Sequence, residues 1–188
     1  LSANVPIDNG FSMNVSPNQT SDEEQIALAS NKNTEILRIA PLTVSSELDI
    51  NMFVSETDVA HVKAQSNGVR SAYYSAAFLL QRILADKLDV DPTEIEIADI
   101  SLKVLEDGTR MAEIILTDEL PNGSGFVRFL HDNFSRILSE AINPDNPNSY
   151  LGKIHSQSHQ KKCDDACYDC LKVFRNMNYH SLLDYRLG

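Results

Sequence analysis

The chain has 188 residues, of which 42% are hydrophobic and 23% are charged, and this composition is typical of a globular domain with a sizeable core. No stretch approaches the ~18 apolar residues that a membrane-spanning helix needs, so the sequence argues against a membrane protein. The net charge of −11 argues against a protein that binds nucleic acid through a broadly basic surface.

The charge is distributed unevenly along the chain. Residues 153–188 hold six Lys and Arg against four Asp and Glu, a local charge of +2, which leaves −13 for residues 1–152. Any contact with nucleic acid is therefore expected in the C-terminal tail, where aromatic residues that could stack on bases also occur. At helical spacing, core packing is the more frequent explanation for those aromatic residues. The basic candidates for a nucleic-acid contact are Lys161, Lys162, Lys172, Arg175 and Arg186.

The N-terminal residues carry no secretion signal. Residues 1–10 lack a basic start followed by an apolar segment. The chain begins with Leu1 rather than Met, and we expect it to be a piece of a longer protein. Because the number of cysteines is odd and no export signal is seen, the sequence predicts a reducing, cytoplasmic environment.

The first third of the chain combines a polar lead-in with the clearest helix. Residues 1–35 are polar and rich in turn-forming residues, which predicts a loosely structured segment. An apolar segment at 35–40 predicts a strand that Pro41 ends, and residues 51–54 are a candidate for a second strand. Residues 66–88 predict a helix, because apolar side chains recur there every three or four positions.

A β-hairpin is predicted in the middle of the chain. Its first strand spans 95–105, where the apolar positions change from odd to even numbers, so we expect a bulge near Ala98-Asp99. Asp107-Gly108 predicts the turn. The returning strand at 111–117 contains an unbroken Ile-Ile-Leu run, which is typical of a strand covered on both faces.

A glycine-containing loop at 121–125 precedes a second amphipathic helix at 126–142, which the proline- and asparagine-rich segment 143–148 ends. Backbone amides of such a loop could hold a phosphate, but the loop lacks the Gly-Lys-Ser/Thr ending of a nucleotide-binding loop. A glycine-mediated turn is the favoured interpretation.

Together these elements predict an α+β fold. A small, mostly antiparallel sheet is expected to be flanked by the two long helices, with a helical C-terminal subdomain that contains the cysteines described next. The predicted organisation is a lead-in at 1–35, an α+β core at 36–148 and a tail of short helices at 149–188, all within one integrated domain.

Three cysteines, the only ones in the chain, lie within eight residues near the C-terminus: Cys163, Cys167 and Cys170. Three clustered thiols cannot all pair as disulfides, but as thiolates they supply three of the four ligands of a tetrahedral, structural Zn²⁺ site. The fourth ligand is expected to be His159, with His155 next.

Alternatives remain open at this point. The fourth ligand could also be His180 or a residue from a segment outside this chain. Cys167 and Cys170 could instead form the redox pair of a thiol-disulfide oxidoreductase, or the cysteines could be inert core residues. Adjacent carboxylates such as Asp118-Glu119 are most often solvated, and no nucleophile lies beside a histidine with an orienting carboxylate. We therefore predict that the chain is not an enzyme.

The cysteine segment at 163–176, followed by His180-Ser-Leu-Leu-Asp-Tyr-Arg-Leu, resembles the C-terminal zinc-binding domain of a family of helicase-like proteins. That family includes the mitomycin repair factor A helicase and the DrmB component of the DISARM phage-defence system. The segments 34–39, 71–80 and 120–126 agree with it, so the resemblance spans roughly residues 5–188. The repair helicase pattern has four cysteines where this chain has three, which leaves the fourth ligand open.

The resemblance implies a non-catalytic zinc-binding accessory domain attached to, or partnered with, a helicase-like ATPase in DNA processing, either phage defence or DNA repair. The domain would then brace the protein, dock a partner and guide DNA. A pure protein–protein scaffold is the other non-catalytic alternative. The chain itself contains neither a Gly-Lys-Ser/Thr loop nor an Asp-Glu-x-His/Asp box, so any ATP hydrolysis would lie outside these residues.

Overall fold

The computed structural model describes residues 3–6, 12–15, 33–42, 50, 52–53, 60–143 and 146–188. The chain divides into two compact units, residues 1–32 and 33–188. In the first unit, β1 (Ala3–Pro6) and β2 (Ser12–Val15) pair antiparallel. The sequence-based prediction for residues 1–35 did not include these two strands.

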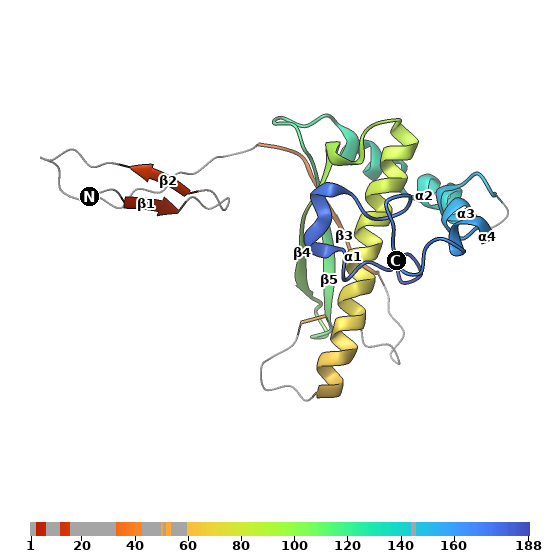
Figure 1. Cartoon of the computed structure of the whole chain (residues 1–188), viewed down its shortest axis with the longest axis horizontal. Coiled ribbons are helices and arrows are strands. Elements are labelled where there is room, and N and C mark those ends of the chain that lie inside the picture. The colour runs from red at the N-terminus through yellow and green to blue at the C-terminus, as the bar shows by residue number, and fades with distance from the viewer. Residues whose placement is uncertain are drawn as a thin grey trace, which may run out of the picture. The chain divides into compact units, whose positions relative to one another are not determined.

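The second unit contains a three-stranded antiparallel sheet in the order β3-β5-β4 (Figure 1). The strands are β3 (Ile36–Ile39), β4 (Ile95–Val104) and the central β5 (Arg110–Asp118). Nearly all of β5 is buried, as its continuous apolar run predicts. With the long helices described below, this sheet confirms the predicted α+β fold.

The predicted bulge and turn are both present in the hairpin. The register shifts between Ile97, which lies opposite Leu116, and Asp99, which lies opposite Ile115. This extra residue lets Ile95 before the bulge and Ile100 after it both face the core. At the turn, Gly108 has a φ of 82°, a conformation that glycine adopts without strain, and its amide donates to the Leu105 carbonyl oxygen at 2.9 Å.

Two sequence expectations differ from the structure in this unit. Of the candidate strand at 51–54, Met52 and Phe53 lie outside any strand, and the other two residues lie outside the described part of the chain. Helix α1 (Ala60–Leu88) begins six residues before the predicted start at 66. Its first residues contain neither Gly nor Pro, so nothing in them stops the helix, although they lack the apolar periodicity that identifies the rest.

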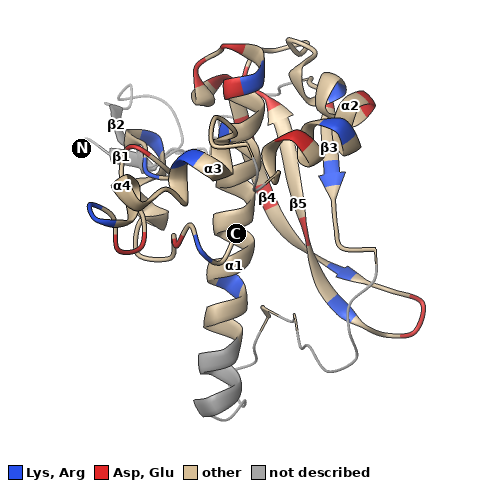
Figure 2. Cartoon of the chain, turned by 90° about the vertical axis from the view of Figure 1, so that its right-hand side faces the viewer, with Lys and Arg blue, Asp and Glu red and all other residues tan. Residues whose placement is uncertain are grey.

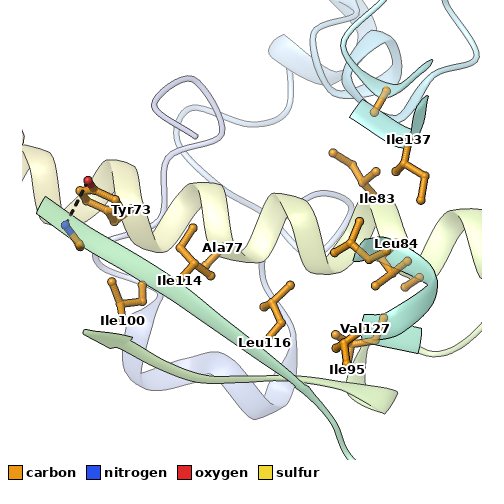
Figure 3. Packing of buried hydrophobic residues seen from close by; sticks show 14 residues of the cluster. Tyr73, Ala77, Ile83, Leu84, Ile95, Ile100, Ile114, Leu116, Val127 and Ile137 are labelled. Carbon is orange, nitrogen blue, oxygen red and sulfur yellow. Dashed lines mark hydrogen bonds between the residues drawn. The ribbon is translucent and has the colours of Figure 1, made fainter. Parts of the chain in front are cut away.

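The main core lies between α1, the sheet and α2 (Phe126–Ala141). Figure 3 shows Tyr73 and Ala77 of α1 on the side of Ile114 of β5, while Leu84 lies near Val127 of α2. The Tyr73 hydroxyl accepts a hydrogen bond from the Ala112 amide at 3.3 Å. The two long helices and the sheet are thus joined in a single cluster.

The tail contains short helical segments, as predicted, and there are three of them: α3 (Tyr150–Ile154), α4 (Gln157–Gln160) and a 3-10 helix at Phe174–Tyr179. A second apolar cluster, formed by Phe78, Leu79, Ile154, Cys163, Cys170, Leu171, Leu183 and Tyr185, joins the tail to α1. Among the described helices, none combines the length and hydrophobicity needed to cross a membrane.

Polar side chains of α1 add to this contact by binding the backbone of the tail. Ser75 Oγ accepts from the Asp184 amide at 2.9 Å, and Ser71 Oγ donates to the Leu182 carbonyl oxygen. Arg82 Nη2 donates to the Lys172 carbonyl oxygen at 3.0 Å. The small side chains at positions 71 and 75 let the tail backbone come this close to the helix.

Candidate metal centre

The three cysteines and His159 lie together in the tail. Their four ligand atoms, the three Sγ atoms and an imidazole nitrogen, all lie within 4.8 Å of one another. Cys170 Sγ is 3.7 Å from Cys167 Sγ and 3.9 Å from Cys163 Sγ, and Cys167 Sγ is 3.4 Å from His159 Nε2. In the part of the chain that the structure describes, no other His, Cys, Asp or Glu joins this group.

These distances fit a zinc ion better than they fit disulfides. Zinc with ~2.3 Å bonds to sulfur and tetrahedral angles separates two thiolate sulfurs by about 3.8 Å and a sulfur from an imidazole nitrogen by about 3.6 Å. Bonded sulfurs would be ~2.05 Å apart. All three cysteines are free thiols. The donor set of three sulfurs and one imidazole is therefore suited to a four-coordinate zinc ion with no open position.

Local backbone structure directs the four side chains toward one point. His159 lies in α4, whose first turn is capped by Ser156 Oγ accepting from the His159 amide at 3.3 Å. Cys167 and Cys170 lie in a tight turn in which the Cys170 amide donates to the Cys167 carbonyl oxygen at 3.1 Å. The Cys167 amide in turn approaches Cys170 Sγ at 3.1 Å, an arrangement that favours a thiolate at Cys170.

Cys163 and Cys170 are buried in an apolar environment that raises the pKa of both thiols in the absence of a cation. Burial, together with the neighbouring Cys167 and Cys170 thiols, raises the pKa of Cys163 to about 12. Burial likewise raises the pKa of Cys170, which is fully buried. A bound zinc ion reverses this preference because a coordinated thiol loses its proton. A reactive redox cysteine needs the opposite, a lowered pKa.

The two other candidate histidines lie outside the group. His155 is exposed at the end of α3, with its ring 5.4 Å from that of Tyr185. His180 Nε2 donates to Asn176 Oδ1 at 2.8 Å and lies 3.1 Å from the Val173 carbonyl oxygen. His180 thus supports the fold of the tail, and His159 is the histidine that the structure places beside the thiols.

The five basic candidates for a nucleic-acid contact do not form one patch of uncompensated charge. Lys161 and Lys162 are exposed beside the cysteines, and Lys172 is half-buried. Arg175 pairs with Glu119 at 3.3 Å, and Arg186 pairs with Asp184 at 2.6 Å and Asp165 at 2.8 Å. Figure 2 shows basic and acidic segments close together around α3 and α4.

The glycine-containing loop before α2 is a turn closed by an internal carboxylate. Asp118 is 0% exposed, and its Oδ2 accepts from the amides of Ser124 at 2.8 Å and Gly125 at 2.7 Å. Its Oδ1 accepts from the Val127 amide at 3.1 Å. The expectation of a solvated Asp118 is therefore wrong, because the side chain occupies the anion-binding position at the start of α2. These amides are not available to a phosphate.

Two tyrosines beside the cysteines were not predicted as parts of the site. The Tyr150 hydroxyl donates to the Cys170 carbonyl oxygen at 2.6 Å, and burial raises the pKa of Tyr150. The ring of Tyr185 packs against His159 with a centroid distance of 5.1 Å. Neither contact has a sequence signal, since Tyr150 lies 20 residues before its partner and Tyr185 lies 26 residues after His159.

Comparison with known proteins agrees with this geometry. Residues 76–171, about half of the chain, match the family described as the MrfA Zn-binding domain. A curated relative, the Druantia protein DruE of Escherichia coli (strain UMEA 4076-1), is 28% identical over 102 residues. The match covers 54% of this chain but only 5% of that protein. No solved structure matches the chain.

The family match includes the two cysteines of the tight turn and the whole of α2, and it begins within α1. The predicted resemblance to a zinc-binding domain of helicase-like proteins is thereby confirmed, and zinc is the metal that both the family and the donor set indicate. The chain belongs to the MrfA Zn-binding domain family.

Proposed function

We propose that the chain is a non-catalytic accessory domain in which one structural zinc ion holds the tail, residues 149–188, on the α+β core, residues 36–148. His159, Cys163, Cys167 and Cys170 are the proposed ligands. The observation that carries the proposal is that the ligand atoms of these four side chains lie within 4.8 Å of one another, a donor set suited to closed tetrahedral coordination.

The metal matters because the tail has little regular structure of its own. Its longest α-helix in the described residues has five residues, too short to be stable alone. Zinc coordination would supply the free energy that orders such a segment. The ordered tail then presents a fixed surface on one side of α1, which a helicase-like partner subunit or a domain of the same longer protein could bind in the cytoplasm.

Purified protein is expected to contain about one zinc per chain, because the four donors leave room for a single ion. A strong chelator should remove the zinc and increase hydrogen exchange throughout the tail, since the apo thiols no longer cross-link it. Elemental analysis before and after chelation, with hydrogen exchange of both samples, makes the measurement. Metal-free protein whose tail is already protected would contradict the proposal.

The zinc content also distinguishes the structural zinc site from the oxidoreductase alternative. A Cys167–Cys170 redox pair requires a reactive thiolate, whereas the pKa of Cys170 is raised by burial. Protein that lacks zinc, forms a disulfide between these two residues and reduces a model disulfide would replace the zinc proposal. Slow alkylation of all three thiols until the chelator is added would support the zinc proposal.

We further propose that the exposed Lys161 and Lys162 guide DNA past the partner ATPase. Their side chains are available in the tail, whereas Arg175 and Arg186 are already paired with carboxylates. The Lys161→Glu/Lys162→Glu variant is expected to bind a single-stranded oligonucleotide several-fold more weakly. Loss of two phosphate contacts should also reduce the slope of log affinity against log salt by about 1.4.

The matched control changes the net charge equally at a distant site. Lys103→Glu/Arg110→Glu alters two exposed residues of the β4–β5 hairpin. Equal effects of both pairs would mean a general charge effect, and no binding by the unaltered protein would favour a pure protein–protein scaffold. Either result would remove the DNA role while leaving the zinc role intact.

A further inference from the structure

His159 lacks the usual hydrogen bond that orients a metal-binding histidine. Such a residue normally binds metal through one ring nitrogen and donates the N–H of the other to a carboxylate or a carbonyl oxygen. Here Nε2 faces Cys167 Sγ at 3.4 Å, while Nδ1 is buried and finds no hydrogen-bond partner among the described residues. The ring must therefore be oriented by packing.

The ring of Tyr185 is the aromatic contact of His159. The two ring centroids are 5.1 Å apart and the ring planes are inclined by 81°, an edge-to-face arrangement. Tyr185 is 4% exposed and belongs to the same buried cluster as Cys163 and Cys170. Its side chain thus has little freedom to move, and it limits rotation of the imidazole.

Tyr185 is itself attached to the loop that carries the cysteines. Its amide donates to the carbonyl oxygen of Asp165, which lies between Cys163 and Cys167, at 3.0 Å. The next residue, Arg186, binds the Asp165 carboxylate at 2.8 Å. One short segment near the C-terminus therefore contacts both the cysteine loop and the histidine.

We propose that Tyr185 is a positioning residue for the metal centre, held in place by Asp165 and Arg186, and that its ring directs His159 Nε2 toward the ion. This inference rests on the proposed zinc function. The inference assigns to an aromatic contact the role that a hydrogen bond donated by the Nδ1–H plays in other sites. The segment from Asp184 to Arg186 is then part of the zinc site although it supplies no ligand.

Replacing Tyr185 with Leu is expected to weaken zinc binding by roughly 10- to 100-fold, the usual effect of removing a group that orients a ligand. Tyr185→Phe keeps the ring and should stay within about 3-fold of the unaltered protein, since the hydroxyl takes no part in the contact. Competition with a chromophoric chelator measures both affinities. Tyr179→Leu is the matched control, because Tyr179 also lies in the tail but packs on Tyr74 of α1 rather than on His159.

A double-mutant cycle separates positioning from general destabilisation. In a His159→Ala background, Tyr185→Leu should have little further effect on zinc affinity, since the residue acts through the missing imidazole. The Co²⁺ form of Tyr185→Leu should also show the visible absorption of a site that has lost its nitrogen ligand. Additive losses of affinity, or an unchanged Co²⁺ spectrum, would overturn the inference.

Arg186→Gln gives a test that does not disturb the buried cluster, because Arg186 is exposed. The substitution removes the ion pair with Asp165 and should accelerate zinc release to a chelator about 3-fold. The effect is expected to be small because the hydrogen bond from the Tyr185 amide to the Asp165 carbonyl oxygen remains. An unaltered protein that binds no zinc would contradict the proposed function. Normal zinc binding with unchanged Tyr185→Leu and Arg186→Gln variants would contradict only the positioning role.

Discussion

Replacing Cys170 with Ser is expected to abolish tight zinc binding and to release the tail, while the sheet and the two long helices stay folded. Cys170 is 0% exposed and its sulfur lies 3.7 and 3.9 Å from the other two sulfurs, so its loss removes a central ligand. Structural zinc contributes an apparent ~10–16 kcal/mol in small zinc-binding peptides. No single contact of the tail approaches that value.

Zinc content and hydrogen exchange of the Cys170→Ser protein provide the measurement. The tail amides should exchange rapidly, whereas those of β5 and of α1 opposite the sheet should remain protected because their cluster is separate. Asp169→Ser is the control, since it changes the exposed neighbour of Cys170 and leaves the donors in place. A Cys170→Ser protein that loses zinc but keeps a protected tail would show that packing alone holds the tail.

Replacing Asp118 with Ala should lower the free energy of unfolding of the core by about 3 kcal/mol. The substitution leaves the amides of Ser124, Gly125 and Val127 without their acceptor, and hydrogen bonds to a charged group contribute about 1.5–3 kcal/mol each before the loop relaxes. It also removes a negative charge from the N-terminus of α2. Chemical denaturation of the zinc-loaded protein measures the loss.

Two variants test the interpretation of this buried carboxylate. Asp118→Asn retains one acceptor oxygen and is expected to cost roughly half as much. Glu119→Ala removes the adjacent, more exposed carboxylate and should cost less than about 1 kcal/mol, as an exposed ion pair does. Equal losses for the Asp118 and Glu119 substitutions would show that net charge, rather than the three amide contacts, is responsible.

Much of the fold was predictable because its elements depend on local patterns. Apolar periodicity identified most of α1 and all of α2, and the change of parity along β4 identified the bulge at Asp99. The turn at Gly108 follows from the preference of glycine for positive φ. The spacing of three cysteines indicated a metal site before any geometry was known.

The remaining features depend on individual hydrogen bonds and short pairings that leave no clear periodic pattern in the sequence. Asp118 is buried because an anion is favourable beside the free amides of α2, and nothing in the sequence distinguishes it from its more exposed neighbour Glu119. The sequence predicted His159 as the fourth ligand but left His180 open, and the hydrogen bond between His180 and Asn176 is what places His180 outside the site. Each strand of the β1–β2 pair alternates apolar and polar residues over only four positions, the shortest run that indicates a strand, within a segment rich in turn-forming residues.

Helix α1 serves two apolar clusters at once, and this limits how its sequence can change in length. Ala77 and Leu84 belong to the cluster at the sheet, while Phe78 and Leu79 belong to the cluster at the tail. One inserted residue turns the following part of a helix by about 100°. An insertion or deletion between Ala77 and Phe78 would therefore turn the residues of the tail cluster, and Leu84 of the sheet cluster, away from their positions relative to Ala77. A substitution changes one side chain and leaves this alignment in place.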